Sequence, residues 1–203
     1  MADTNGTTGA TDTEEAPASV RRMGGPESEE LTRLAAVFED LQYVLQCCEH
    51  LVSTLAQNPD PVLVEALWTG ALVGYVRCFS GRTEVLKDSD VAELKMEGQV
   101  TEFHGLMKKL RDHYASRHVN PRETFTVGVA QNNAGAPTGV AVVSATQPTV
   151  DDTAVRQLGR IAYGLSGLVD ARMQEAQATV LTAASAMNPA QMSSLPLVHI
   201  DNG

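Results

Sequence analysis

The stretch that decides the fold is residues 31–55, LTRLAAVFEDLQYVLQCCEHLVSTL. Its apolar side chains return at alternating steps of three and four residues, which places them on one side of an α-helix. The helix is expected to begin near Ser28, a favourable N-cap, and to end near Asn58, because two prolines follow. Its length is then about 45 Å. The predicted apolar seam consists of Leu31, Leu34, Phe38, Leu41, Leu45, Cys48, Val52 and Leu55.

Three more helices and one hairpin are predicted after this first helix. A second helix runs over 61–79, where Gly70 and Gly74 let a neighbouring backbone come close. A third runs over 88–118 with a kink at Gly98, and a fourth follows the capping residues 149–152. Between the last two, residues 124–146 alternate around a polar turn, which predicts a β-hairpin lying on the helices.

These elements predict a mainly α fold, a four-helix up-and-down bundle with one inserted β-hairpin. The predicted divisions are a disordered acidic tail at 1–26, a helical domain at 27–187 and a flexible tail at 188–203. Aromatic residues are only 4% of the chain, so aliphatic side chains must supply most of the core. The residues expected to be buried are Leu34, Phe38, Leu41, Leu45, Trp68, Leu72, Phe103, Leu110, Leu158 and Leu165.

Composition excludes several classes of protein. The apolar runs are shorter than the roughly 18 residues of a membrane helix, and the N-terminal stretch does not have the pattern of a secretory signal. The three cysteines suggest neither a disulfide framework nor a zinc site. A soluble cytoplasmic protein without a metal or other cofactor is expected. The net charge of −10 argues against a dedicated DNA-binding protein.

One basic segment, residues 104–123, runs against this acidity. It holds five Lys and Arg residues, two acids and three of the five histidines. The simplest interpretation is a solvated helix face, and the alternative is a site for a phosphate or another anion. His104, Arg111 and His118 recur every seven residues, so on one helix they form a single stripe.

This stripe has the chemistry needed for RNA cleavage without a metal. A guanidinium such as that of Arg111 binds a phosphodiester in bidentate fashion and stabilises its transition state. An imidazole such as that of His118 can take the 2'-hydroxyl proton or protonate the leaving oxygen. In the alternative interpretation Arg111 pairs with an acid and His118 donates to the last carbonyls of the helix.

Two stretches resemble the HEPN superfamily: residues 67–79, LWTGALVGYVRCF, and residues 111–120, RDHYASRHVN, with His104 between them. The resemblance covers roughly 30–123, and the last helix by its place in the order. It implies a helical bundle and a catalytic set of Arg111, Asp112 and His118. We also expect His104, Lys108 and Arg117 to bind substrate. Relatives more often carry the histidine one place earlier, where this chain has Arg117.

The resemblance further implies a homodimer whose interface includes the third helix, with the motifs of both copies at one cleft. The function it implies is an endoribonuclease that cleaves RNA through a 2',3'-cyclic phosphate, in a defence or toxin–antitoxin setting. The candidate partners are RNA and a protein partner or antitoxin. Many family members lack activity, so a helical interaction or scaffold module is the alternative. A phage-associated accessory structural protein is another.

Overall fold

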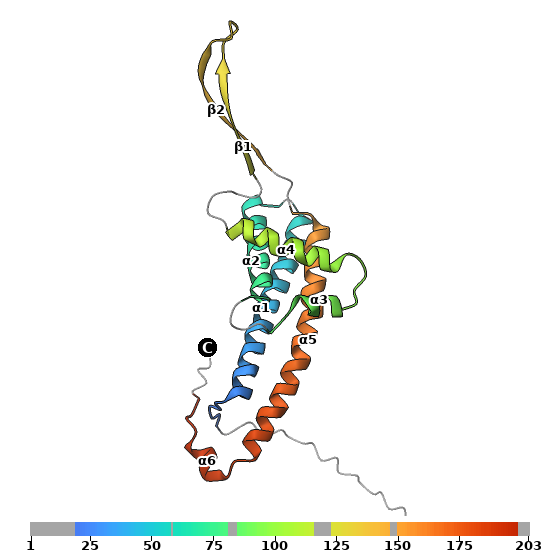
Figure 1. Cartoon of the computed structure of the whole chain (residues 1–203), viewed down its shortest axis with the longest axis vertical. Helices are drawn as coiled ribbons and strands as arrows, with labels where there is room; N and C mark the ends of the chain where they lie inside the picture. The colour runs from blue at the N-terminus through green and yellow to red at the C-terminus, as the bar shows by residue number, and fades with distance from the viewer. Residues whose placement is uncertain (1–18, 58, 81–84, 116–122, 147–149, 199–203) are drawn as a thin grey trace, which may run out of the picture.

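The computed structural model describes residues 19–57, 59–80, 85–115, 123–146 and 150–198. This part of the chain is mainly helical and contains one antiparallel pair of strands, which confirms the predicted class (Figure 1). In chain order the elements are α1 (Pro26–Leu55), α2 (Pro61–Arg77), α3 (Asp88–Glu93), α4 (Val100–Ala115), β1 (Glu123–Gln131), β2 (Pro137–Thr146), α5 (Asp152–Ser185) and α6 (Pro189–Ser194).

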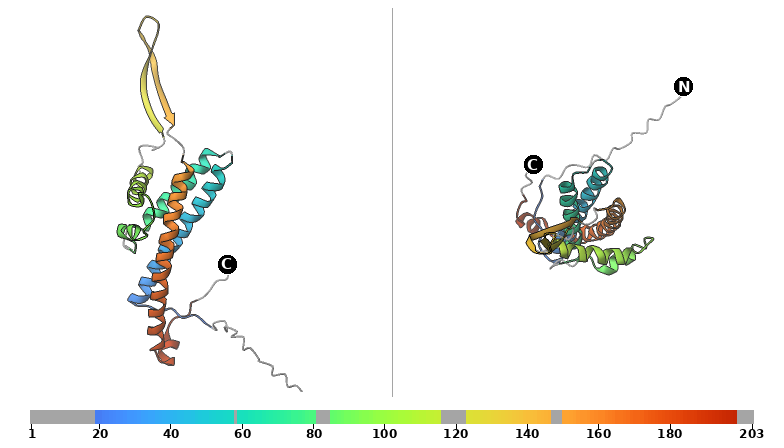
Figure 2. Two further views of the ribbon diagram at one scale, coloured as in Figure 1. Left: turned by 90° about the vertical axis from the view of Figure 1, so that its right-hand side faces the viewer. Right: turned by 90° about the horizontal axis from the view of Figure 1, so that it is seen from above.

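The two longest helices, α1 and α5, lie side by side and antiparallel along the long axis of the molecule (Figure 1, Figure 2). α2 packs against α1, and Trp68 on α2 is buried as predicted. Two of these helices have an aspartate as N-cap, and the second aspartate, Asp151, lies within the predicted capping residues 149–152. Asp60 accepts a hydrogen bond from the amide of Val62 at the start of α2, and Asp151 accepts one from the amide of Ala154 at the start of α5.

α1 begins and packs differently from the prediction. Its N-cap is Gly25 and its first residue is Pro26, two residues before Ser28. Phe38 and Leu45, placed at the centre of the predicted seam, are only partly buried. α1 contacts both α2 and α5, so it needs a wider apolar face than a two-helix seam provides. Its fully buried residues are Leu34, Val37, Leu41, Val44, Cys47, Cys48 and Leu51.

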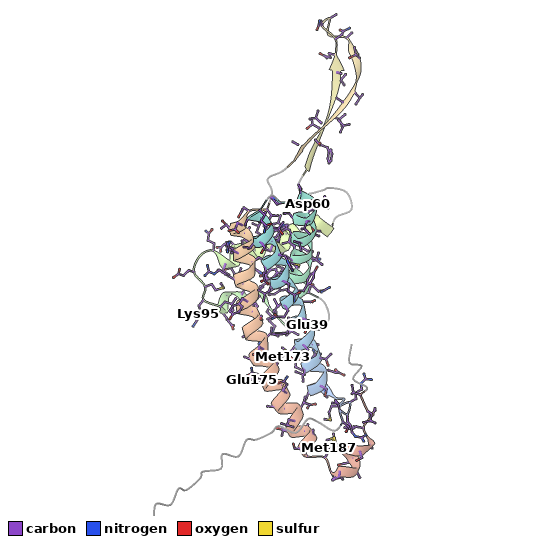
Figure 3. The ribbon with its side chains drawn as sticks, turned by 180° about the vertical axis from the view of Figure 1, so that it is seen from behind. Glu39, Asp60, Lys95, Met173, Glu175 and Met187 are labelled. Carbon is purple, nitrogen blue, oxygen red and sulfur yellow. The ribbon has the colours of Figure 1, made fainter. Side chains whose placement is uncertain are left out.

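The predicted third helix is in fact two helices, α3 and α4. Between them Lys95 has φ 49° and Gly98 has φ 95°. Both values lie in the left-handed region, where an α-helix of L-residues cannot continue. Lys95 marks this turn at the side of the molecule (Figure 3). α4 then lies across the long axis instead of along it, so it does not follow the up-and-down order expected of the third helix (Figure 1, Figure 2).

The β-hairpin is present where it was predicted, but its placement differs. β1 and β2 pair from Glu123↔Thr146 to Gln131↔Pro137, and the Asn132 side chain closes the turn by accepting from the amides of Ala134 and Ala136. Instead of lying on the helices, the strands project from the end of the helical body (Figure 1). Side chains extend from both faces of this arm (Figure 3).

The two ends of the described chain meet at the far end of α1 and α5. Arg21 pairs with Leu197 as a β-bridge, and its Nη1 donates to the carbonyls of Ser193 and Leu195. Asn188 and Gln191 form a reciprocal cap at the start of α6. The segment expected to be a flexible tail at 188–203 therefore contains a short helix and a bridge. The tail expected at 1–26 likewise joins this structure through Arg21.

Candidate functional site

α4 places four of the predicted site residues: His104, Lys108, Arg111 and Asp112. At 100° per residue, the first three fall within about 60° of arc on the helix, as the stripe predicted. His118 and Arg117 lie outside the described residues. The described residues therefore include Arg111 and Asp112 of the predicted catalytic set, but not its histidine.

His104 lies inside the fold and is only 2% exposed. Its Nδ1 is 2.7 Å from the hydroxyl oxygen of Tyr75 on α2, and its Nε2 is 3.0 Å from Oδ1 of Asp88 on α3. The ring of Phe79 packs on the imidazole, with the ring centres 4.6 Å apart. The expectation that His104 contacts substrate thus differs from the structure, because both ring nitrogens are engaged within the fold.

The carboxylate of Asp88 decides which atoms of this network donate and which accept. The ionised carboxylate of Asp88 can only accept, so the imidazole donates from Nε2. With its proton on Nε2, the neutral form of the ring accepts the Tyr75 hydroxyl at Nδ1. Lys108 donates to both oxygens of Asp88, at 2.9 and 3.0 Å. These bonds from Lys108, and then from His104, lower the pKa of Asp88. Burial raises the pKa of Tyr75, so this hydroxyl stays protonated.

Lys108 was predicted to bind substrate, and in the structure it is shared between solvent and this network. Its side chain is 37% exposed while its ammonium is bound to Asp88. Its ammonium therefore keeps an N–H donor for solvent, while the Asp88 carboxylate offsets part of its positive charge. Any anion at this face of α4 competes with Asp88 for Lys108.

Arg111 is half-buried one turn further along α4. Its Nη2 is 3.2 Å from Oδ1 of Asp112, whose side chain is 69% exposed. The Nε of Arg111 is buried and, among the described residues, has no hydrogen-bond partner. Among the described residues this long contact to a solvated neighbour is the one ion pair of Arg111, and it uses one of the five guanidinium donors. The structure thus places Arg111 and Asp112 together, as the motif requires.

A groove lies elsewhere in the described part of the chain. It has a volume of about 660 Å³ and runs between the start of α4 and the start of α5, with Phe103, Leu106 and Ile161 among its apolar lining. Arg156 and Arg160 also line it. At the same 100° per residue, Phe103 and Leu106 point about 80° and 140° away from Arg111 around α4. None of the stripe residues His104, Lys108 and Arg111 lines this groove.

The three cysteines belong to the core of the fold. Cys47, Cys48 and Cys78 are buried and free, and burial raises the pKa of Cys48 and Cys78 to about 12, so their thiols stay protonated. Within the described residues no cluster of three or more His, Cys, Asp or Glu side chains could hold a metal ion. Across the same part of the chain, no helix has the length and apolar character needed to cross a membrane.

Two residues of the His104 network, Tyr75 and Asp88, are not among the predicted site residues. Tyr75 lies within the predicted second helix, and Asp88 is the first residue of the predicted third helix. A signal for Tyr75 did exist, since a tyrosine in a buried face usually needs a partner for its hydroxyl. Nothing local indicated that the partner would be His104, which is 29 residues away in the chain.

Comparison with known proteins does not assign the chain to a family. It matches no protein-family model, no curated protein and no solved structure at a significant level. The resemblance to the HEPN superfamily rests on residues 67–79, His104 and residues 111–120 alone.

Proposed function

We propose that this chain is a HEPN-like endoribonuclease that cleaves RNA without a metal and leaves a 2',3'-cyclic phosphate. The observation that carries the proposal is the state of Arg111: a half-buried guanidinium whose Nε has no hydrogen-bond partner and whose one ion pair within the described part of the chain is a 3.2 Å contact to Asp112. A guanidinium whose donors are uncommitted is ready to bind an anion in bidentate fashion.

In this proposal Arg111 binds the two non-bridging oxygens of the scissile phosphate. The 2'-oxygen forms a bond to phosphorus while the bond from phosphorus to the 5'-oxygen breaks. His118 takes the proton of the 2'-hydroxyl or gives one to the departing 5'-oxygen, and water carries the other of these two protons. Asp112 orients Arg111. Arg111 offsets the negative charge that grows on the phosphate in the transition state.

The same proposal includes the finer architecture. Helices α1, α2, α4 and α5 are the HEPN-like bundle, and two copies pair across α4 so that their Arg111 side chains face one groove. RNA as substrate and a protein partner or antitoxin follow from the resemblance, with the cytoplasm as the setting.

The test is cleavage of a labelled single-stranded RNA of mixed sequence by the purified full-length chain, in buffer with EDTA. Arg111→Ala should lower the rate by about 100-fold or more through lost charge stabilisation. His118→Ala should lower it by about 100- to 10,000-fold through lost proton transfer. The double variant should be inactive, and the 3' ends of the product should resist phosphatase until acid opens the cyclic phosphate.

Matched controls come from the same helix. Lys109→Ala removes one exposed positive charge on the opposite side of α4 from Arg111, and should leave the rate within about threefold because exposed charges act through a screened potential. His113→Ala removes a histidine outside the proposed set. Equal rates for the wild type and the double variant, with both folded, would exclude the nuclease.

A specific observation favours a second function, an interaction module. Arg111 already contacts Asp112, and an exposed hairpin projects from the helices. In that case the wild type has no ribonuclease activity, while Arg111→Ala lowers the free energy of unfolding.

A further inference from the structure

The projecting hairpin has two chemically different faces. Residues directly opposite in an antiparallel pair share a face, and successive residues alternate between faces. The pairs Val127↔Val142 and Val129↔Val140 therefore lie on one face together with Phe125, and we name these five residues the valine face. The opposite face carries the pairs Thr126↔Val143, Gly128↔Ala141 and Ala130↔Gly139, which are mostly small.

The valine face is open to solvent along its length. Its five side chains are between 59% and 74% exposed. Residues 125–145 contain no charged side chain, although charged residues make up 20% of the chain. The sheet consists of β1 and β2 alone, so each described strand has one unpaired edge. A two-stranded hairpin is marginally stable in water at best. Exposed strand edges are usually protected from pairing with another chain by Lys or Pro. Such an arm needs a partner.

The pattern of the valine face suits a second copy of the same chain. A two-fold contact requires a patch that complements itself. Here valine stands opposite valine in both central pairs, so the centre of the face looks the same from either strand, while Phe125 stands opposite Ser144 at its base.

The area of the valine face suits a reversible contact. Burying a fully exposed Val or Phe side chain removes roughly 60–120 Å² of apolar surface from water. These side chains are 59–74% exposed, so five on each of two arms supply roughly 350–900 Å². That is the size of a weak interface, since a stable one needs about 1,000 Å² or more.

Charge is compatible with the same partner. Two copies of a chain with a net charge of −10 repel each other at long range. The arm carries its uncharged stretch beyond the helical body (Figure 1), so a contact there adds no repulsion of its own.

We infer that the valine face is a homodimer contact, in which the hairpins of two copies pack face to face through Phe125, Val127, Val129, Val140 and Val142. This contact does not depend on the proposed ribonuclease activity. It uses no residue of the α4 stripe.

The test is sedimentation of the full chain over a range of concentrations, with two substitutions that add the same charge at neighbouring positions. Val127→Glu puts a carboxylate in the valine face and should raise the dissociation constant of the dimer roughly 100-fold, because the charge must be desolvated. Thr126→Glu puts the carboxylate on the opposite face and should leave the constant within about threefold. Helical circular dichroism checks that both variants keep the helical body.

Cross-linking keeps the test informative if Val127→Glu unfolds the arm. The native cysteines are buried, so Val127→Cys adds the single exposed thiol. It should join two copies under mild oxidation, and Thr126→Cys should not. A wild type that stays monomeric at about 100 μM overturns the proposal and points to a different partner for the arm. Equal behaviour of the two glutamate variants, or of the two cysteine variants, overturns it as well. Loss of cleavage in Arg111→Ala with the dimer intact would leave this contact standing.

Discussion

His104 is buried because the fold satisfies both of its ring nitrogens. Tyr75 supplies a donor from α2 and Asp88 an acceptor from α3, so the imidazole connects three elements. A buried imidazole with one nitrogen unpaired would cost free energy, because a polar group loses its water without a replacement. This explains why the histidine on α4 closest to the core serves the packing of the fold, whereas Arg111, two turns later, remains partly open to solvent.

Tyr75→Phe tests this network. The ring remains and its edge contact with Phe79 is kept, but the Nδ1 of His104 loses its hydrogen-bond donor. We expect the free energy of unfolding to fall by about 1–3 kcal/mol, measured by urea denaturation followed by circular dichroism. Tyr163→Phe is the control, since that side chain on α5 is 74% exposed and should change nothing measurable. If both variants match the wild type, the Tyr75 bond adds no stability.

At the scale of elements, α1 and α2 approach closely at one glycine. A Cβ placed on Gly74 would lie 3.1 Å from Cγ2 of Val44 and 3.3 Å from Cδ1 of Tyr43. The predicted ridge of small residues on the second helix is therefore real at this position. Just beyond it, Nε of Arg77 donates to Oδ2 of Asp40 at 2.7 Å and Nη2 makes a second, parallel bond, which joins the two helices at the surface.

Gly74→Ala should destabilise the protein although alanine is the better helix former. The propensity gain is about 1 kcal/mol, while crowding a packed helix contact costs about 1–3 kcal/mol. Gly70→Ala is the matched control on the same helix. Its Cβ would meet only the hydroxyl end of Tyr43, which is 48% exposed and can swing away, so we expect little loss or a small gain. Thermal unfolding compares the two, and a more stable Gly74→Ala variant would contradict the close approach.

At the scale of the whole molecule, two carboxylates connect the α3 segment to distant parts of the fold. Asp90 is 5% exposed, accepts from the backbone amide of Lys87 at 2.7 Å and from Nη2 of Arg172 on α5 at 2.6 Å. Burial alone would raise its pKa, but the bonds from Arg172 and Lys87 outweigh burial and lower the pKa. Asp88 binds Lys108 on α4 and has a lowered pKa as well.

These lowered pKa values predict how stability responds to acid. A carboxylate whose folded pKa lies below its ordinary value of 3.8 stabilises the fold above that pH. The stabilisation is lost as pH falls through the folded pKa. Asp90→Asn should therefore be less stable than the wild type at pH 6 and should lose less stability between pH 6 and pH 2.5. Urea denaturation at both pH values measures this. Glu49→Gln, at an exposed site, removes the same charge and should lose as much as the wild type.

Much of the local structure could be predicted because it depends on neighbouring residues. Asp60 before Pro61 marks the start of α2, and Asp151 marks the start of α5, since a cap needs only the next few amides. The hairpin was predicted at 124–146 from the alternation and from the polar turn at 131–136, and the structure has it at 123–146. The break at Lys95 and Gly98 was underestimated as a kink, because left-handed backbone at a lysine has no sequence signal.

The candidate site was predictable only in its composition. The spacing of Arg111 and Asp112 put both on α4, and the structure agrees. Spacing on one helix does not say which side of it faces the core, so His104 could not be separated from Arg111. That separation depends on Tyr75 and Asp88, which come from other helices.

The sequence by itself determined the helical class, the central place of Trp68 and the aliphatic core, because periodicity and composition decide which faces must leave water. Only the tertiary structure decided that α4 crosses the long axis, that the hairpin stands free and that α6 returns to Arg21. Those features depend on contacts between residues far apart in the chain, such as Arg172 with Asp90, 82 residues away. A local sequence pattern carries no information about such pairs, because the two residues come into contact only when the chain has folded.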